Sequence, residues 1–176
     1  MKVLAFDVGV KNLAFVAMTG DRALLAWENV AVPGDTLEAN VRAVHSLLRA
    51  RPALFGSADV VLIERQPPLN RKMSCVAHAL FMFFLDRCPS VLFVDPKVKT
   101  AGFADFLATR AASGPDRIDT PGAAYRRRKA ESVACARHAL AESPWLAVLE
   151  GARKLDDLCD AYTSAYSWIG RQPVRV

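Results

Sequence analysis

Four carboxylate side chains lie where the ends of predicted strands and helices would bring them together. Asp7 interrupts an apolar strand, Glu64 directly follows the apolar run 60–63, and Asp157 and Asp160 open an apolar helix one turn apart. Carboxylates gathered at one place repel each other and need cations between them. Hard oxygen ligands suit Mg²⁺, for which Mn²⁺ can substitute. The pattern predicts a site for two metal ions, which can activate a water molecule and stabilise the leaving oxygen during phosphodiester hydrolysis.

Each of these acids also has a purely structural interpretation. Asp7 could cap the turn at residues 9–12, and Glu64 could mark the point where its strand meets water. Asp157 and Asp160 could complement the dipole of the helix that they open. Against this, a carboxylate inside an apolar strand is costly unless it is paired or bound to a metal ion.

Two further acids and one lysine bear on the same site. Asp156 lies four residues before Asp160, and Asp95 ends a strand, so spacing alone excludes neither of them as a ligand. Lys129 lies on the inward stripe of a predicted helix, where its charge could orient water or stabilise a phosphorane-like transition state. The structural alternative is a lysine that runs along the helix surface and keeps its charge in solvent.

The predicted elements would place these side chains on one α/β sheet. Strands are expected at 2–8, 13–18 and 23–32, separated by short turns as in an antiparallel meander. A helix capped by Asp35 or Thr36 follows, then a strand at 59–63, a helix at 74–87, a strand at 91–94, and helices at 125–142 and 154–169, the last ending at Gly170. Residues 96–124 are expected to be irregular apart from a short helix at 103–110. This order predicts the RNase H-like fold, a mixed five-stranded sheet flanked by helices.

Length and composition set the class of protein. The chain has 176 residues, of which 52% are hydrophobic and 23% charged, which predicts one domain over residues 1–176 with a substantial core. No signal peptide and no membrane-spanning run is apparent, so a soluble intracellular protein is expected. The cysteines lack metal-binding spacing and are expected to be reduced thiols in or near the core: Cys75, Cys88, Cys135 and Cys159.

Positive charge is concentrated in the middle of the chain. Residues 65–137 hold 13 basic and 6 acidic side chains, whereas the segments before and after each carry a small acidic excess. Such a concentration is typical of a surface that binds a polyanion. The candidate contacts to DNA phosphates are Lys11, Gln66, Arg71, Lys72, Arg126, Arg127 and Arg128. Phe103 and Phe106 could stack at a branch point, although packing against the core is the favoured interpretation.

Four segments follow one another along the chain: LAFDVGVKNLAF, VLIERQPP, AYRRRKAESV and RKLDDLCDAYTSA. Together they resemble the motifs of the poxvirus Holliday junction resolvases, a RuvC-type group with relatives in other large DNA viruses and in fungal mitochondria. The resemblance implies metal ligands at Asp7, Glu64, Asp157 and Asp160, a catalytic Lys129, and Asp156 outside the metal cluster. It further implies two Mg²⁺ ions per site, a homodimer, paired symmetric nicks in a four-way DNA junction, and action where DNA is replicated or recombined, in a host cell if the protein is viral. Residues 96–124 match nothing in the group.

Other functions fit parts of the sequence. The run FDVGVKN resembles the phosphate-binding turn of actin-like ATPases and sugar kinases, but those enzymes need a second related domain and a second glycine-rich motif, so no nucleotide cofactor is expected. The same site could instead cut RNA–DNA hybrids or other branched DNA, because the metal chemistry would be the same. A DNA-binding protein without catalysis is disfavoured by the intact set of carboxylates with Lys129.

Overall fold

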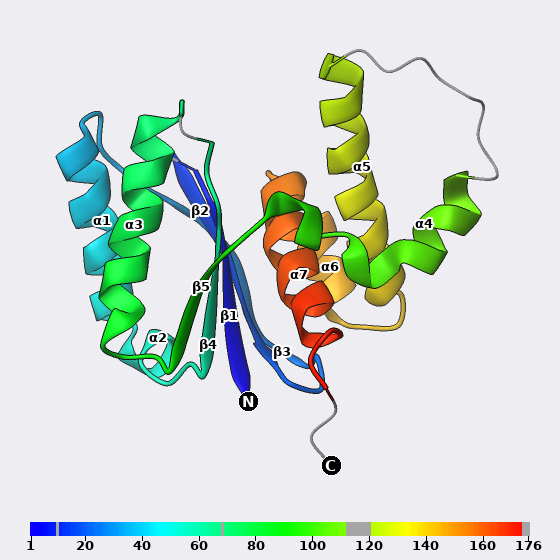
Figure 1. The fold of residues 1–176 in the computed structure, drawn as a ribbon, viewed down its shortest axis with the longest axis horizontal. Helices are drawn as coiled ribbons and strands as arrows, with labels where there is room; N and C mark the ends of the chain where they lie inside the picture. Colours follow the sequence, from blue (N-terminus) through cyan, green and yellow to red (C-terminus); the bar gives the residue numbers. More distant parts are fainter. Residues whose placement is uncertain (10, 68, 112–120, 174–176) are drawn as a thin grey trace.

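A five-stranded sheet forms the centre of the computed structural model, which describes residues 1–9, 11–67, 69–111 and 121–173 (Figure 1). The strands are β1 (Lys2–Val8), β2 (Asn12–Thr19), β3 (Leu24–Ala31), β4 (Val60–Glu64) and β5 (Ser90–Val94). They lie in the order β3-β2-β1-β4-β5. β1, β2 and β3 pair antiparallel, and β4 and β5 add as parallel strands beyond β1. The predicted mixed sheet is confirmed.

The central strands are buried on both faces, which explains their continuous apolar runs. Along β1, Val3 and Ala5 point to one face of the sheet, whereas Leu4 and Phe6 point to the other. β4 alternates in the same way, with Leu62 on the face of Val3 and Ala5. Each face therefore has its own apolar core, and each core needs a layer of helices to cover it.

One face of the sheet is covered by α1 (Leu37–Ala50) and α3 (Arg71–Leu85), with the short α2 (Pro52–Phe55) at its lower end (Figure 1). Thr36 caps α1 by accepting a hydrogen bond from the backbone N–H of Ala39 at 3.2 Å, which selects it from the two predicted caps. Phe84 of α3 packs on Phe6, with ring centroids 5.7 Å apart. Aromatic packing thus joins this helical layer to the sheet.

The other face is covered by α7 (Leu155–Ile169), with α5 (Pro121–Ala139), α6 (Trp145–Glu150) and α4 (Ala104–Ala111) beyond it (Figure 1). Small residues such as Ala161 and Ala165 are almost fully buried and allow α7 to approach the sheet closely. Trp27 of β3 donates a hydrogen bond from Nε1 to the carbonyl oxygen of Leu158 at 2.9 Å. This contact fixes the first part of α7 against the edge strand.

Several predicted boundaries are wrong. α3 begins at Arg71 rather than residue 74, because Asn70 caps it and its polar first turn carries no apolar periodicity. α5 begins and ends earlier than the predicted 125–142. The segment predicted to be irregular contains the 3-10 turns η1 (Pro96–Val98) and η2 (Ala101–Phe103) and then α4, while residues 112–120 lie outside the described residues. Gly170 follows α7 as predicted, with φ of −65°.

The prediction that all four cysteines lie in or near the core is wrong for one of them. All of them are free thiols, and Cys88, Cys135 and Cys159 are buried, but Cys75 is exposed. α3 turns Val76 and Ala77 toward the sheet, which leaves Cys75 on its outer surface. Within the described ranges, no helix is long and apolar enough to cross a membrane.

Candidate active site

Asp7 and Glu64 lie side by side at the ends of the parallel strands β1 and β4. Phe6 pairs in register with Ile63, so the next residue on each strand is Asp7 on one and Glu64 on the other. Because side chains alternate along a strand, both carboxylates point to the face that α7 covers. Asp160 meets them there from α7. The structure therefore brings three of the predicted acids together.

The three carboxylates meet at the ammonium group of Lys99. Its Nζ lies 3.2 Å from Asp7 Oδ1, 2.9 Å from Glu64 Oε2 and 2.7 Å from Asp160 Oδ2. The exposed fractions of the four side chains lie between 12% and 17%, so solvent screens these charges only weakly. Lys99 thus supplies the positive charge that the mutual repulsion of the acids requires.

The backbone near Lys99 is fixed against α7. Ser167 donates its hydroxyl to the carbonyl oxygen of Lys99 at 2.8 Å and accepts a hydrogen bond from the N–H of Gly102 at 3.0 Å. A Cβ on Gly102 would lie 2.9 Å from Ser167 Cα, so this close approach requires glycine. Lys99 was not predicted from the sequence. The available signal was its position just after β5, which ends at the same edge of the sheet as β1 and β4.

The cluster changes the protonation of its members. Burial and a hydrogen bond with Glu64 raise the pKa of Asp7 to about 7, although the charge of Lys99 opposes the shift. Burial by itself would lower the pKa of Lys99, but the charges of the three carboxylates outweigh burial and raise it. Lys99 therefore stays protonated, and its single charge only partly balances three acids.

Asp157 lies at the edge of this cluster, beside Lys129. Lys129 Nζ is 3.7 Å from Asp157 Oδ1 and forms a closer ion pair with Asp156. Burial and the charges of Asp156 and Asp7 raise the pKa of Asp157, so Asp157 and Asp7 are within electrostatic reach of each other. Lys129 faces α7, as its place on the inward stripe predicted, but it contacts the Asp156–Asp157 pair rather than the acids around Lys99.

Three residues for which the sequence left alternative roles have packing or capping contacts in the structure. Asp95 is exposed and caps η1 by accepting a hydrogen bond from the N–H of Lys97 at 2.8 Å, so it lies outside the cluster. Phe103 is 5% exposed and stacks on Tyr166 at 4.7 Å. Phe106 stacks on His138 at 4.2 Å. Both phenylalanines are therefore engaged in packing, which was the favoured interpretation.

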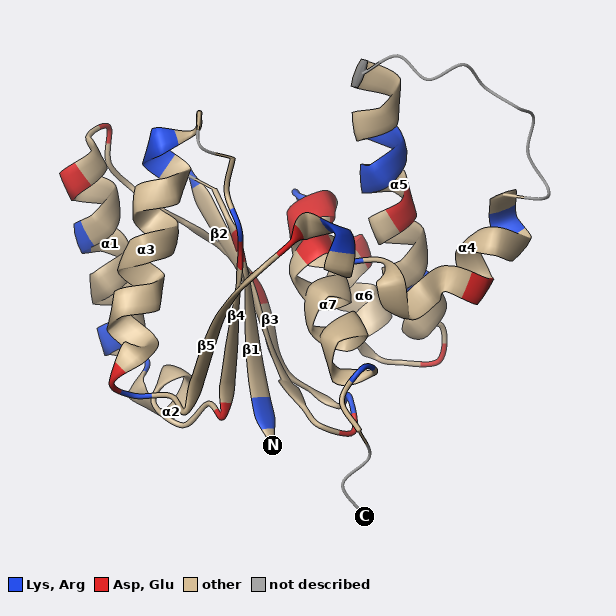
Figure 2. Cartoon of the chain, viewed as in Figure 1, with Lys and Arg blue, Asp and Glu red and all other residues tan. Residues whose placement is uncertain are grey.

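Basic side chains flank the acidic cluster on two sides (Figure 2). Arg71 and Lys72 are exposed on the first turn of α3, and residues 126–128 are exposed on α5, whereas acidic residues gather at the start of α7 (Figure 2). Lys11 is exposed just before β2. Gln66 is half-buried and donates its amide to the carbonyl oxygen of Glu64 at 3.2 Å. The predicted DNA contacts thus surround the cluster, and all except Gln66 present charge to solvent.

One exposed apolar side chain in the loop that follows Glu64 was not predicted from the sequence. Leu69 lies in the loop between β4 and α3, five residues after Glu64, and is 97% exposed. A single exposed leucine is common on protein surfaces, so its exposure alone assigns it no role. Its position next to Arg71 and Lys72 places an apolar group within a basic surface.

The acidic cluster suits a metal ion by its chemistry, but not in the present positions of its side chains. In the observed side-chain positions, no group of three or more His, Cys, Asp or Glu side chains among the described residues is arranged to hold one. The chemistry of the donors nevertheless fits a divalent cation, because Asp7, Glu64 and Asp160 offer hard oxygen ligands from three rigid elements around one positive charge. Lys99 would have to withdraw its ammonium group for a metal ion to enter.

The sheet order and the acids at its edge place the chain in the RNase H-like class of folds. No protein-family model and no curated protein sequence matches it. It is similar to the solved structure of the fowlpox virus Holliday junction resolvase, at 21% identity over 97% of this chain and 98% of that chain with a TM-score of 0.64. It is also similar to the yeast mitochondrial Holliday junction resolvase Ydc2, at 15% identity over 95% and 78% of the two chains with a TM-score of 0.65.

RuvC of Thermus thermophilus is a third similar structure, at 19% identity over 96% of this chain and 95% of that chain with a TM-score of 0.59. Further similar structures show the fowlpox virus resolvase and the T. thermophilus RuvC in complex with Holliday junction DNA. These similarities confirm the predicted RNase H-like fold. They also fall within the group that the four sequence motifs resemble.

Proposed function

We propose that the chain is a metal-dependent endonuclease that resolves four-way DNA junctions by paired, symmetric nicks. The observation that carries the proposal is the convergence of Asp7, Glu64 and Asp160 around one cation, from β1, β4 and α7. The similarity of almost the whole chain to solved Holliday junction resolvases supports the choice of substrate. The exposed basic side chains on both sides of the cluster suit a polyanion.

Two Mg²⁺ ions, or Mn²⁺ in their place, would be held by Asp7, Glu64, Asp157 and Asp160. When bound, such ions supply Lewis-acid stabilisation of a phosphodiester and activate water. The two strands and the buried helix hold the carboxylate oxygens in fixed positions, which hydrolysis in a single geometry requires. Lys129 remains protonated beside Asp157 and can donate a hydrogen bond to a phosphate oxygen or to the attacking water.

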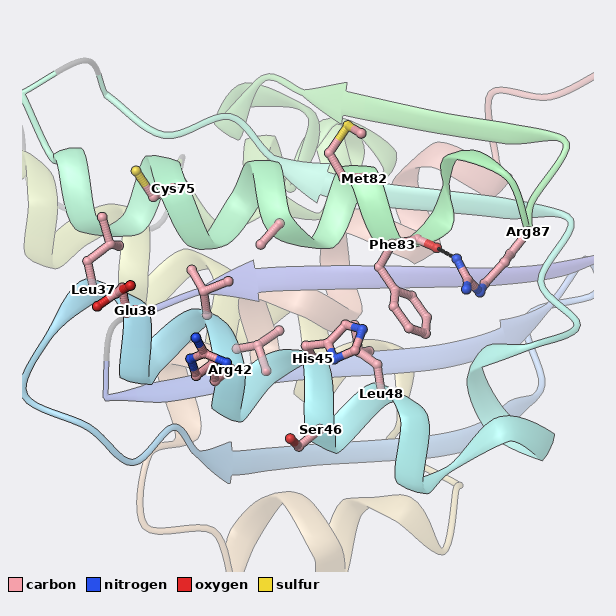
Figure 3. Close-up of a pocket in the computed structure, with 13 residues that line it drawn as sticks. Leu37, Glu38, Arg42, His45, Ser46, Leu48, Cys75, Met82, Phe83 and Arg87 are labelled. Carbon is pink, nitrogen blue, oxygen red and sulfur yellow. Dashed lines mark hydrogen bonds between the residues drawn. The ribbon is translucent and has the colours of Figure 1, made fainter.

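The proposal includes a homodimer, because two symmetric nicks need two active sites related by a two-fold axis. The outer surface of α3 offers apolar side chains for such a contact: Met82 is 63% exposed and Leu85 49%. A groove of about 860 Å³ between α1 and α3 adjoins them, with Cys75, Met82 and Phe83 among its lining residues (Figure 3). Sedimentation velocity of the purified chain measures its state of association.

The deciding experiment is cleavage of end-labelled DNA by the purified protein in Mg²⁺. The substrates are a four-way junction, a matched linear duplex, a flap and an RNA–DNA hybrid. We expect paired nicks at symmetric positions in the junction, and no cutting of the duplex. Cutting of the hybrid alone would assign the same site to a ribonuclease. Junction binding without cutting of any substrate would assign the chain to the structure-selective binding proteins.

A further inference from the structure

A second groove lies beside the proposed active site, between the edge strand β3 and the segment that leads into α7. Its volume is about 850 Å³. Asn12, Asn29 and Ala31 line it from the sheet, and Val148, Arg153 and Lys154 line it from the α6–α7 side. None of these residues was predicted to contact DNA, and none belongs to the acidic cluster.

The groove is positively charged. Arg153 and Lys154 are both exposed, and neither forms an ion pair with a carboxylate of the described residues. The acidic side chain at the groove is Glu28, which alternates onto the opposite face of β3 and forms an ion pair with Arg51 Nη1 at 2.6 Å. The charge of Lys154 also acts on Asp157, where it opposes the rise in pKa that burial causes, whereas the acid that lines the groove pairs with Arg51. The groove therefore carries two exposed cations without a direct ion pair among the described residues, which complements a polyanion.

Two asparagine amides add hydrogen-bonding capacity. Asn29 Oδ1 is buried and has no hydrogen-bond partner among the described residues. With the Asn12 amide turned so that its oxygen faces Lys154, that oxygen accepts a hydrogen bond from Lys154 Nζ at 2.5 Å. In that orientation the Asn12 NH₂ group donates to the carbonyl oxygen of Lys11 at 3.2 Å. Because an amide NH₂ group has two hydrogens, it retains a second N–H for a phosphate oxygen, and the NH₂ group of Asn29 can donate in the same way.

The groove lies at the same end of the sheet as the acidic cluster. Asn12 pairs with Ala31 at the end of the sheet where β1 carries Asp7. Lys154 immediately precedes α7, whose first turn carries Asp157. The hydrogen bond from Trp27 to the carbonyl oxygen of Leu158 joins the two walls. A DNA strand bound in the groove would therefore lie beside the proposed site.

We propose that this groove binds the sugar–phosphate backbone of the DNA strand that adjoins the scissile phosphate. Arg153 and Lys154 contact successive phosphates, and the amides of Asn12 and Asn29 donate to phosphate oxygens. The inference rests on the proposed nuclease function. It adds a contact surface on the β3 side of the cluster, separate from the basic residues on α3 and α5. Phosphate contacts of this kind position a strand without reading its sequence.

The test compares the double variant Arg153→Ala/Lys154→Ala with the control variant Arg49→Ala, whose exposed cation lies at the far end of α1. Affinity for a fluorescent four-way junction is measured by anisotropy in EDTA over a range of salt concentrations, so that metal binding plays no part. We expect the double variant to bind about tenfold more weakly and its salt slope to fall by about 2, because two phosphate contacts are lost. The control variant should match the wild type. A double variant with wild-type affinity and slope overturns the proposal.

A second measurement locates the DNA. Val148 is 45% exposed at the groove, so Val148→Cys in a Cys75→Ser background gives a thiol there that alkylates readily. Bound junction should slow this alkylation severalfold, and an unchanged rate contradicts DNA in the groove. A wild-type protein that binds no branched DNA overturns the proposed function together with this inference. A wild-type protein that binds and cuts, with the double variant indistinguishable from it, overturns the groove alone.

Discussion

Asp7 illustrates how the surroundings of one side chain decide its chemistry. A carboxylate next to the core residues Phe6 and Val8 would be costly if it were isolated. Lys99 offsets part of this cost, and a proton shared with Glu64 near neutral pH offsets more. Neither compensation removes the surplus of negative charge, so the cluster retains a preference for a stronger cation. The surplus of negative charge around Asp7 is what supports the proposed binding of a metal ion at this site.

Removal of single carboxylates should separate catalysis from binding. Asp7→Asn, Glu64→Gln, Asp157→Asn and Asp160→Asn are each expected to reduce junction cleavage by at least about a hundredfold, because each removes a proposed metal ligand. Junction affinity should persist or rise, because a negative charge near phosphate is lost. Asp156→Asn is the matched control, since Asp156 pairs with Lys129 outside the cluster, and it should have a milder effect. Single-turnover kinetics measure the cleavage rate, and fluorescence anisotropy measures the affinity for the junction. Wild-type rates in two or more of the four variants would refute the site.

The pKa of Asp7 predicts how stability without metal depends on pH. It rises from an ordinary value of 3.8 to about 7 in the folded chain, so between these values the folded state binds more protons than the unfolded state. The melting temperature in EDTA should therefore fall as the pH rises from about 4 to about 7 and level off above that. Asp7→Asn, which cannot lose this proton, should show a flatter profile. A variant profile parallel to that of the wild type would exclude Asp7 as the cause.

Lys99→Met tests the role of the ammonium group among the acids. The substitution keeps much of the side-chain length but leaves three facing carboxylates without a cation. Thermal unfolding in EDTA near neutral pH should show a loss of about 3 kcal/mol. Mg²⁺ should then raise the melting temperature more in the variant than in the wild type, because no ammonium group competes with it. Equal melting temperatures for both proteins in EDTA would show that the Lys99 contacts contribute little.

At the scale of elements, the sequence predicts those parts of the fold that have a strong periodicity. β1, β2, β3 and β4 are recovered to within a residue or two because their apolar runs are bounded by turn residues. The short helices α2 and α6 were not predicted, since four and six residues carry too little periodicity. Convergence of Asp7, Glu64 and Asp160 follows from topology and alternation. The position of Lys99 in the cluster could not be predicted in this way, because it depends on how the segment after β5 crosses to α7.

The loop between β4 and α3 carries its own prediction. Leu69 is almost fully exposed, so Leu69→Ser should leave the melting temperature nearly unchanged. If Leu69 inserts between unstacked bases at the branch point, the variant should bind the junction about tenfold more weakly while duplex binding stays the same. Leu25→Ser is the control, with a leucine that is 52% exposed on β3. A uniform loss on junction and duplex would instead mean that the loop only supports neighbouring phosphate contacts.

At the scale of the whole molecule, the two helical layers have different surroundings. The α7 layer carries the acidic cluster, the Lys129 contact and the second groove, so it is the layer that would face DNA. The α1 and α3 layer carries exposed apolar side chains and a groove away from the cluster. The first turn of α3, with Arg71 and Lys72, lies beside the cluster, so only the remaining outer surface of this layer is left for the association between subunits that we propose.

A dimer in which only one subunit is active should make one nick in the junction instead of two. A heterodimer of wild-type and Asp7→Asn chains, purified through two different tags, has one complete site. On a plasmid with an extruded cruciform, two nicks made in one binding event linearise the circle, whereas a single nick leaves an open circle. The wild-type homodimer should therefore yield linear product, and the heterodimer should accumulate open circles at about half the initial nicking rate. Linear product from the heterodimer at the wild-type rate would mean that one site cuts both strands in turn, and the two-fold arrangement would then not be needed for resolution.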